Sequence, residues 1–305
     1  MVSNIADLKY DIVYNFSGNL NDNIKTYEQI GELYAHLIQK KNKKISVDFT
    51  KVNFISANLL AALGACLDYT IKNNGHEVYV NGLNKKIKDL MARNGFNRHF
   101  NFATKEDTFK KSIKYEIFKA TTEQLTYFEK YMSIYIFEHK GIPSMSTEYR
   151  YRIIDNLLEI FNNVSDHVDS QNVYVCGQFF EKNKNLKFSI VDIGETFRDI
   201  IKEYFISKGQ IPPQKCIEWA VQTGHSTKTD KPGGLGLSTL LEFLQYNRGS
   251  FTILSGSECY VYSIGGAQTR ELHAGFPGTV VTIEIKLSDD NLYLYDDEKS
   301  ETIIF

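Results

Sequence analysis

The sequence predicts an α/β protein of two domains, residues 1–110 and 111–288, followed by an acidic tail at residues 289–305. Strand-like and helix-like segments alternate through the first domain, which is the pattern of a parallel or mixed sheet. In the second domain a long amphipathic helix with a polar patch precedes a group of strand-like segments. A length of 305 residues also suits two domains of ordinary size better than one.

In the first domain, runs of apolar and β-branched residues predict strands at residues 9–16, 43–50 and 76–83. Apolar residues at helical spacing predict helices at residues 24–41, 58–72 and 84–94. Glycine follows the second and third helices, as is common at a helix end. At the start of the second helix, Ser56 or Asn58 can act as the N-cap.

In the second domain, the same reasoning predicts helices at residues 122–140, 147–168 and 238–246. Strands are predicted at residues 114–120, 172–183 and 185–194, and two more follow, one from residues 250–255 with 258–263 and one at residues 279–287. Between residues 224 and 237 lies a polar, glycine-rich loop that leads directly into the helix at residue 238. Backbone N–H groups at such a helix start favour an anion, although a glycine-rich loop alone is a weak signal.

Composition excludes several classes of protein. The net charge of −2 gives no overall field that would attract nucleic acid or an anionic membrane, and no nucleic-acid motif is visible. The cysteines are scattered without a C-x-x-C pair, so we expect buried thiols rather than a zinc site or disulfides. No apolar leader or run of 18 apolar residues is visible, so we expect a cytoplasmic protein.

On the helix at residues 147–168, helical spacing predicts a core-facing stripe of Ile154, Leu157, Leu158, Phe161, Ser165 and Val168. A polar patch on the opposite side is formed by Glu159, Asn163 and Asp166. Glu159 and Asn163 are four residues apart, so their side chains project from neighbouring positions on one face. Two carboxylates and an amide could hold a divalent cation and a water molecule. A solvated helix face is the alternative interpretation, since charged residues are mostly exposed.

The first domain resembles the STAS domain of anti-sigma-factor antagonists over roughly 110 residues. The segment from Val47 to Phe96 carries the resemblance: a strand, a short motif before a helix, a glycine, a strand and a short helix. The phosphorylated serine of that family aligns with Asn58, which has no hydroxyl, and a slip of one or two residues aligns it with Ser56 instead. By the first alignment the domain is a binding module without its switch.

Three motifs in the second domain resemble the GHKL family of ATP-binding proteins, which includes histidine kinases, gyrase-type ATPases and anti-sigma-factor kinases. Glu159-x-x-x-Asn163 resembles the N box, Asp192-x-Gly194 the G1 box, and residues 226–237 the lid and G2 box. The resemblance covers about residues 112–287. It implies a two-layer α/β sandwich with helices on one face of a mixed sheet.

The resemblance also implies a site for ATP and Mg²⁺. Asn163 would coordinate the Mg²⁺, Glu159 would orient or deprotonate the nucleophile, and Asp192 would accept a hydrogen bond from the adenine amino group. Asp192 before a glycine fits a plain turn equally well. The other nucleotide-binding positions by resemblance are Gly194, Thr227, Lys228, Gly233, Gly234, Leu235, Gly236, Leu237 and Thr279.

We therefore expect a bacterial signalling protein that binds and slowly hydrolyses Mg-ATP, with closure of the lid changing its interaction with a protein partner. One alternative is a serine protein kinase of the anti-sigma-factor type that acts on a STAS-domain partner. A second is a scaffold that holds ATP without catalysis, which the presence of Glu159 disfavours. The sequence leaves open the partner's identity and whether the chain forms a homodimer.

Overall fold

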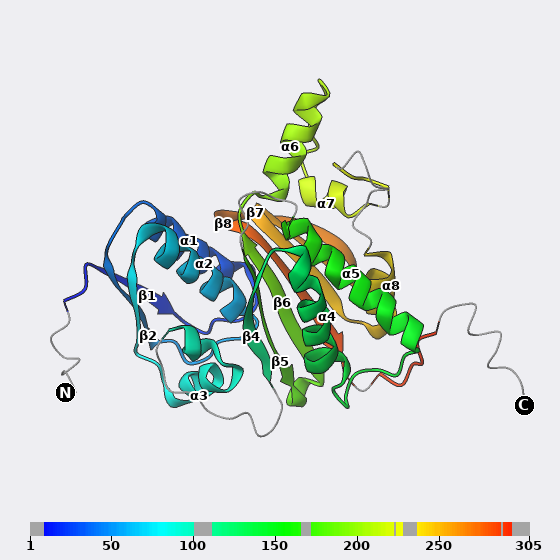
Figure 1. Cartoon of the computed structure of the whole chain (residues 1–305), viewed down its shortest axis with the longest axis horizontal. Helices are drawn as coiled ribbons and strands as arrows, with labels where there is room; N and C mark the ends of the chain where they lie inside the picture. Colours follow the sequence, from blue (N-terminus) through cyan, green and yellow to red (C-terminus); the bar gives the residue numbers. More distant parts are fainter. Residues whose placement is uncertain are drawn as a thin grey trace, which may run out of the picture.

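The computed structural model describes residues 9–100, 112–165, 172–222, 224–227, 237–287 and 289–294. They form two sheets with helices between and beside them (Figure 1). One sheet is parallel with strand order β1–β2–β3, and the other has the order β4–β5–β6–β8–β7. Every neighbouring pair in the second sheet is antiparallel. The α/β class is confirmed, whereas the mixed sheet expected for the second domain is antiparallel.

The N-terminal unit, residues 9–100, alternates strands and helices as predicted. Its strands are β1 (Ile12–Ser17), β2 (Lys44–Lys51) and β3 (Glu77–Asn81). Its α-helices are α1 (Ile24–Ile38), α2 (Leu59–Asn74) and α3 (Lys85–Asn94). Asn23 and Asn84 cap α1 and α3 through their side chains, and the left-handed conformation of Gly75 and Gly95 ends α2 and α3.

The C-terminal unit, residues 112–294, supplies the larger sheet. Its strands are β4 (Ser112–Lys119), β5 (Asn172–Phe180), β6 (Asn185–Ile193), β7 (Ser250–Ser263) and β8 (Gly266–Lys286). Its α-helices are α4 (Leu125–Met132), α5 (Thr147–Ser165), α6 (Phe197–Ser207), α7 (Cys216–Ala220) and α8 (Ser238–Asn247). None of the helices in the described residues is long and apolar enough to cross a membrane.

The strands after residue 250 differ from the prediction. The strand predicted from residues 250–255 with 258–263 is β7, which is continuous and has an irregular register around Gly256. Its partner β8 begins well before Thr279, because the segment from Gly266 onward forms a long hairpin with β7. All four cysteines are buried and free, as predicted.

Strand β6 divides the molecule into two cores. Phe188 and Ile190 point into a core shared with α4, α5 and α8, whereas Val191 and Ile193 point into a core shared with α1 and α2. The alternation follows from the two-residue period of a strand. Figure 1 shows α1 and α2 on one side of the larger sheet and α4, α5 and α8 on the other. The helices α4, α5 and α8 of the C-terminal unit therefore cover one face of its sheet, and α1 and α2 of the N-terminal unit cover the other.

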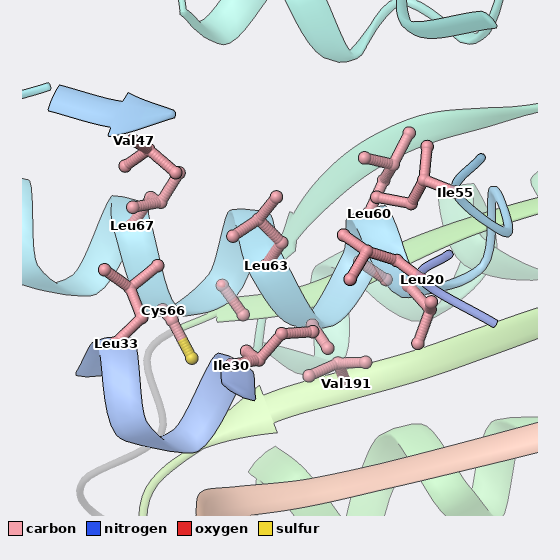
Figure 2. Packing of buried hydrophobic residues seen from close by; sticks show 14 of the residues in the cluster. Leu20, Ile30, Leu33, Val47, Ile55, Leu60, Leu63, Cys66, Leu67 and Val191 are labelled. Carbon is pink, nitrogen blue, oxygen red and sulfur yellow. The ribbon is translucent and has the colours of Figure 1, made fainter. Parts of the chain in front are cut away.

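Close packing of α1 and α2 makes the N-terminal unit part of the larger sheet's core. Figure 2 shows Ile30 of α1 and Val191 of β6 beside Leu63 of α2. Glycines allow the close approach. A Cβ added at Gly31 would lie 2.5 Å from the backbone oxygen of Gly275 in β8, and one added at Gly64 would overlap the Tyr115 ring of β4.

An ion-pair network closes the same interface. The Lys187 ammonium lies 2.8 Å from Asp22 and 3.1 Å from Glu284. Burial alone would raise the pKa of Glu284, but Lys286, Lys187 and Asn185 lower it to about 2. Burial would lower the pKa of Lys187, and Asp22 and Glu284 raise it above its usual value. The network therefore stabilises the fold at neutral pH and loses this contribution as acid protonates Glu284.

We predict that Gly31→Ala destabilises the whole chain by about 1–3 kcal/mol, because the new methyl group must push α1 away from β8. The direction of the change in unfolding free energy is informative, since replacing glycine by alanine within an unpacked helix would stabilise the protein by about 1 kcal/mol. Urea unfolding measures the change. Gly265→Ala is the control, because its Cβ would meet nothing closer than 4.0 Å. Increased stability of Gly31→Ala would show that α1 does not pack against β8.

Candidate functional site

Helix α5 carries one set of candidate residues at the edge of its buried face. Besides Tyr149 in its first turn, its buried hydrophobic residues are Ile153, Ile154, Leu157, Ile160 and Phe161, all in the core beneath the helix. The predicted stripe included Ile154, Leu157 and Phe161, which is confirmed, and Leu158, which is partly buried. It missed Ile153 and Ile160. The helix is described to Ser165, so Asp166, His167 and Val168 lie outside the described residues.

Three polar residues of α5 share the next sector of the helix. At 3.6 residues per turn, Asn163 projects within about 20° of Asn156, and Glu159 within about 60°. Asn156 is 8% exposed, whereas Glu159 and Asn163 are half-buried. Glu159 and Asn163 thus lie well away from the centre of the buried face around Leu157, as predicted, but they are partly covered rather than fully solvated. A half-buried carboxylate and amide in this sector can face a ligand held between α5 and a neighbouring element.

A second set of candidate residues forms a polar row across three strands. Asp192 of β6 is directly opposite Thr279 of β8, which is opposite Ser255 of β7. All three face the same side of the sheet as α5, because the preceding row, Ile190, Val281 and Ile253, lies in the core beneath that helix. The apolar core thus ends in a polar row at this edge.

Hydrogen bonds and a glycine hold this row in place. Ser255 Oγ lies 3.0 Å from Thr279 Oγ1, and it accepts a hydrogen bond from the backbone N–H of Phe197 at the start of α6. Gly278 has φ +154°, and a Cβ there would lie 2.8 Å from the Cα of Ile193. The backbone of β8 therefore approaches β6 directly beside Asp192, which is 6% exposed. Gly194 donates its N–H to Pro277 at 3.1 Å.

The two sets lie at one end of the sheet. The chain leaves β6 at its Asp192 end to form α6, and Figure 1 shows the carboxyl end of α5 at this same end, with α6 and α7. Sequence reasoning missed α6. A capping box of Thr196 and Asp199 at its start, with mutual side-chain and backbone hydrogen bonds, was the available signal.

The start of α8 is fixed to α5. Asn156 Oδ1 accepts a hydrogen bond of 2.8 Å from the backbone N–H of Leu240 in the first turn of α8. Leu237, a predicted nucleotide contact, is 1% exposed in the core, so only its backbone can meet a ligand. Asn156 was also missed, although a polar residue within an apolar stripe is a signal that a specific partner is needed.

Several predicted residues in the loop fall beyond what the structure describes. Thr227 is half-buried, just before the gap. The predicted positions outside the described residues are Lys228, Gly233, Gly234, Leu235 and Gly236. Among the described residues no three His, Cys, Asp or Glu side chains come together as a metal site. A cation at Asn163 would therefore take most of its ligands from phosphate and water, as Mg²⁺ commonly does.

The two positions that the sequence analysis aligned with the STAS phospho-acceptor are closed by the larger sheet. Ser56 and Asn58 are 5% and 0% exposed, and the Ser56 hydroxyl donates to Asn58 Oδ1 at 2.7 Å. Asn58 Nδ2 donates to Ser189 Oγ of β6 at 3.1 Å, and Ser189 pairs with Thr282 of β8 at 2.7 Å. Asn58 makes no N-cap hydrogen bond to α2, so its predicted capping role is wrong. Its amide instead joins the two units.

Comparison with known proteins leaves the family of the chain open. No model of a protein family matches the sequence, and no curated protein matches it either. The function has to be argued from the geometry above.

We predict that Asn58→Asp destabilises the protein by about 3 kcal/mol at pH 8 and by less at pH 5. Burial raises the pKa of the introduced carboxyl in the folded state, so the penalty grows as the pH rises above the carboxyl's unfolded value. Urea unfolding at both pH values measures it, and Asn53→Asp, at an exposed position before α2, is the control. An equal effect of both substitutions would contradict the closed interface.

Proposed function

We propose that the chain is a GHKL-type protein that binds Mg-ATP between α5, the polar end of β6 and β8, and the start of α8. In this proposal it hydrolyses ATP slowly, and closure of the loop before α8 changes its interaction with a protein partner. Its N-terminal unit is a STAS-like module built permanently onto the sheet. The observation that carries the proposal is Asp192, a nearly buried carboxylate in the polar row where the core beneath α5 ends.

Each residue has a chemical task in this proposal. The Asp192 carboxylate accepts from the adenine amino group, with Thr279 beside it and Gly278 allowing close packing of the two strands. Backbone N–H groups at the start of α8 face the phosphates, because the positive end of the helix dipole favours an anion. Asn163 supplies one oxygen ligand to Mg²⁺, whose charge neutralises the phosphates. Glu159, one turn earlier on α5, orients or deprotonates the nucleophile.

The position of the N-terminal unit bears on the kinase alternative. Ser56 and Asn58 lie against β6 on the face of the sheet opposite α5. A γ-phosphoryl group held on the α5 face is separated from them by the sheet itself. If the acceptor is a protein hydroxyl, it is therefore not that of Ser56 in the same chain. Incubation with γ-labelled ATP, with and without a candidate partner, distinguishes released phosphate from labelled protein.

We predict that Asp192→Asn weakens Mg-ATP binding by about ten- to a hundredfold, the effect of replacing a charged acceptor in a buried hydrogen bond. Calorimetry with ATP and with inosine triphosphate, which lacks the amino group, isolates this contact. The preference for ATP should fall in Asp192→Asn and persist in Asp155→Asn, a control on the exposed side of α5. If Asp192→Asn kept the wild-type preference for ATP over inosine triphosphate, Asp192 would not contact the adenine amino group.

We predict that Glu159→Ala lowers ATP turnover by roughly two to four powers of ten while ATP affinity stays close to that of the wild type. The carboxylate acts on the nucleophile and not on bound ATP, so its removal affects the transition state alone. Phosphate release and calorimetry give the two quantities, with Asp155→Ala as the control. Full turnover in Glu159→Ala would exclude the catalytic role, and loss explained wholly by weaker binding would favour an ATP-holding scaffold.

A further inference from the structure

We infer that Asn156 is a positioning residue that sets the start of α8 for the phosphates of the bound nucleotide. The inference rests on the proposed function and adds to it a residue outside all the motifs that suggested ATP binding. Asn156 lies on α5 one turn before Glu159, and its side chain contacts α8 through the backbone N–H of Leu240. It therefore connects the helix that carries the metal ligand with the helix that faces the phosphates.

The surroundings make this hydrogen bond specific. Asn156 is 8% exposed and lies between Ile153, Leu157 and Ile160, all of which are buried in the core. Burying an amide among apolar side chains costs free energy unless the amide is hydrogen-bonded. The hydrogen bond to Leu240 therefore fixes the position of α8 along the axis of α5. A buried apolar residue would pack here without fixing that position.

A second buried asparagine holds the other end of α8. Asn247 is 3% exposed, donates to the backbone oxygen of Lys286 at 2.9 Å and accepts from its N–H at 2.7 Å. Both ends of the helix are thus anchored by asparagine, one to α5 and one to β8. Only the Asn156 end faces the proposed site, which makes Asn247 a matched control for the general loss of an anchor.

The inference is tested through the part of the affinity that the phosphates contribute. We take the ratio of the dissociation constant of adenosine to that of Mg-ATP, each measured by competition against a fluorescent ATP analogue. Asn156→Leu should lower this ratio about tenfold and leave adenosine binding unchanged, because one positioned hydrogen bond at the phosphate end is lost. Hydrogen exchange at the Leu240 amide should accelerate in the same variant.

Asn156→Asp gives a second readout that does not depend on tolerance of leucine. Its carboxylate still accepts from Leu240, so that amide should stay protected. Because this hydrogen bond is kept, the ratio should stay closer to the wild-type value than in Asn156→Leu. Asn247→Leu should leave the ratio unchanged.

Each contrary outcome has one meaning. An unchanged ratio in Asn156→Leu, or an equal fall in Asn247→Leu, overturns the inference while the proposed function stands. A wild-type protein that binds Mg-ATP no better than adenosine contradicts the proposed function and the inference with it.

Discussion

Strand β6 is the constraint on which the rest of the structure depends, because both of its faces are buried by different layers. Phe188 and Ile190 are 1% and 2% exposed on one face, and Val191 is 1% exposed on the other. Burial of each such side chain contributes about 1.5–3 kcal/mol. A register slip of one residue would exchange the two faces and place Ser189 and Asp192 in the wrong layers. The position of the candidate site and that of the N-terminal unit are therefore fixed by the same strand.

This arrangement also decides what the N-terminal unit can do. A STAS-like module that is to be switched by phosphorylation needs an accessible hydroxyl, whereas Asn58 and Ser56 take part in a buried chain of hydrogen bonds with Ser189 and Thr282. Tyr27 of α1 extends the chain, 3.3 Å from Thr282 and hydrogen-bonded to Asp22. The N-terminal unit serves as a structural layer on the larger sheet. Any influence of the nucleotide on it has to pass through β6 and β8, which carry Asp192 and Thr279 on their opposite face.

Sequence patterns predicted the features that depend on local periodicity. They did not predict features that depend on a contact with a residue far away in the sequence. Alternating segments located the strands and helices of the N-terminal unit, and the apolar spacing located most of the buried face of α5. The docking of α1 and α2 on the larger sheet was missed, because nothing local to Gly31 or Gly64 reveals that Gly275 or Tyr115 lies against it. The supposed cap at Asn58 failed for the same reason, since Ser189 is 131 residues away in the sequence.

In the candidate site, the glycine-containing motifs drew attention to Asp192 and Thr279, and the register of β6 with β8 places them opposite each other. Leu237 was predicted as a nucleotide contact from its place in a motif, but its side chain is buried in the core. Asn156 and Ser255 could not be assigned from the sequence, since their roles depend on the backbone of α8 and of α6.

One strand, β6, joins the proposed nucleotide site to the N-terminal unit. Pulsed hydrogen exchange with mass spectrometry across a urea series, with and without Mg-ATP, tests it in the wild-type chain. The account predicts that peptides from β2 and α2 unfold at the same urea concentration as those from β5 and β6, and that Mg-ATP shifts both midpoints upward together. An N-terminal unit that unfolds at its own midpoint, unmoved by Mg-ATP, would contradict it.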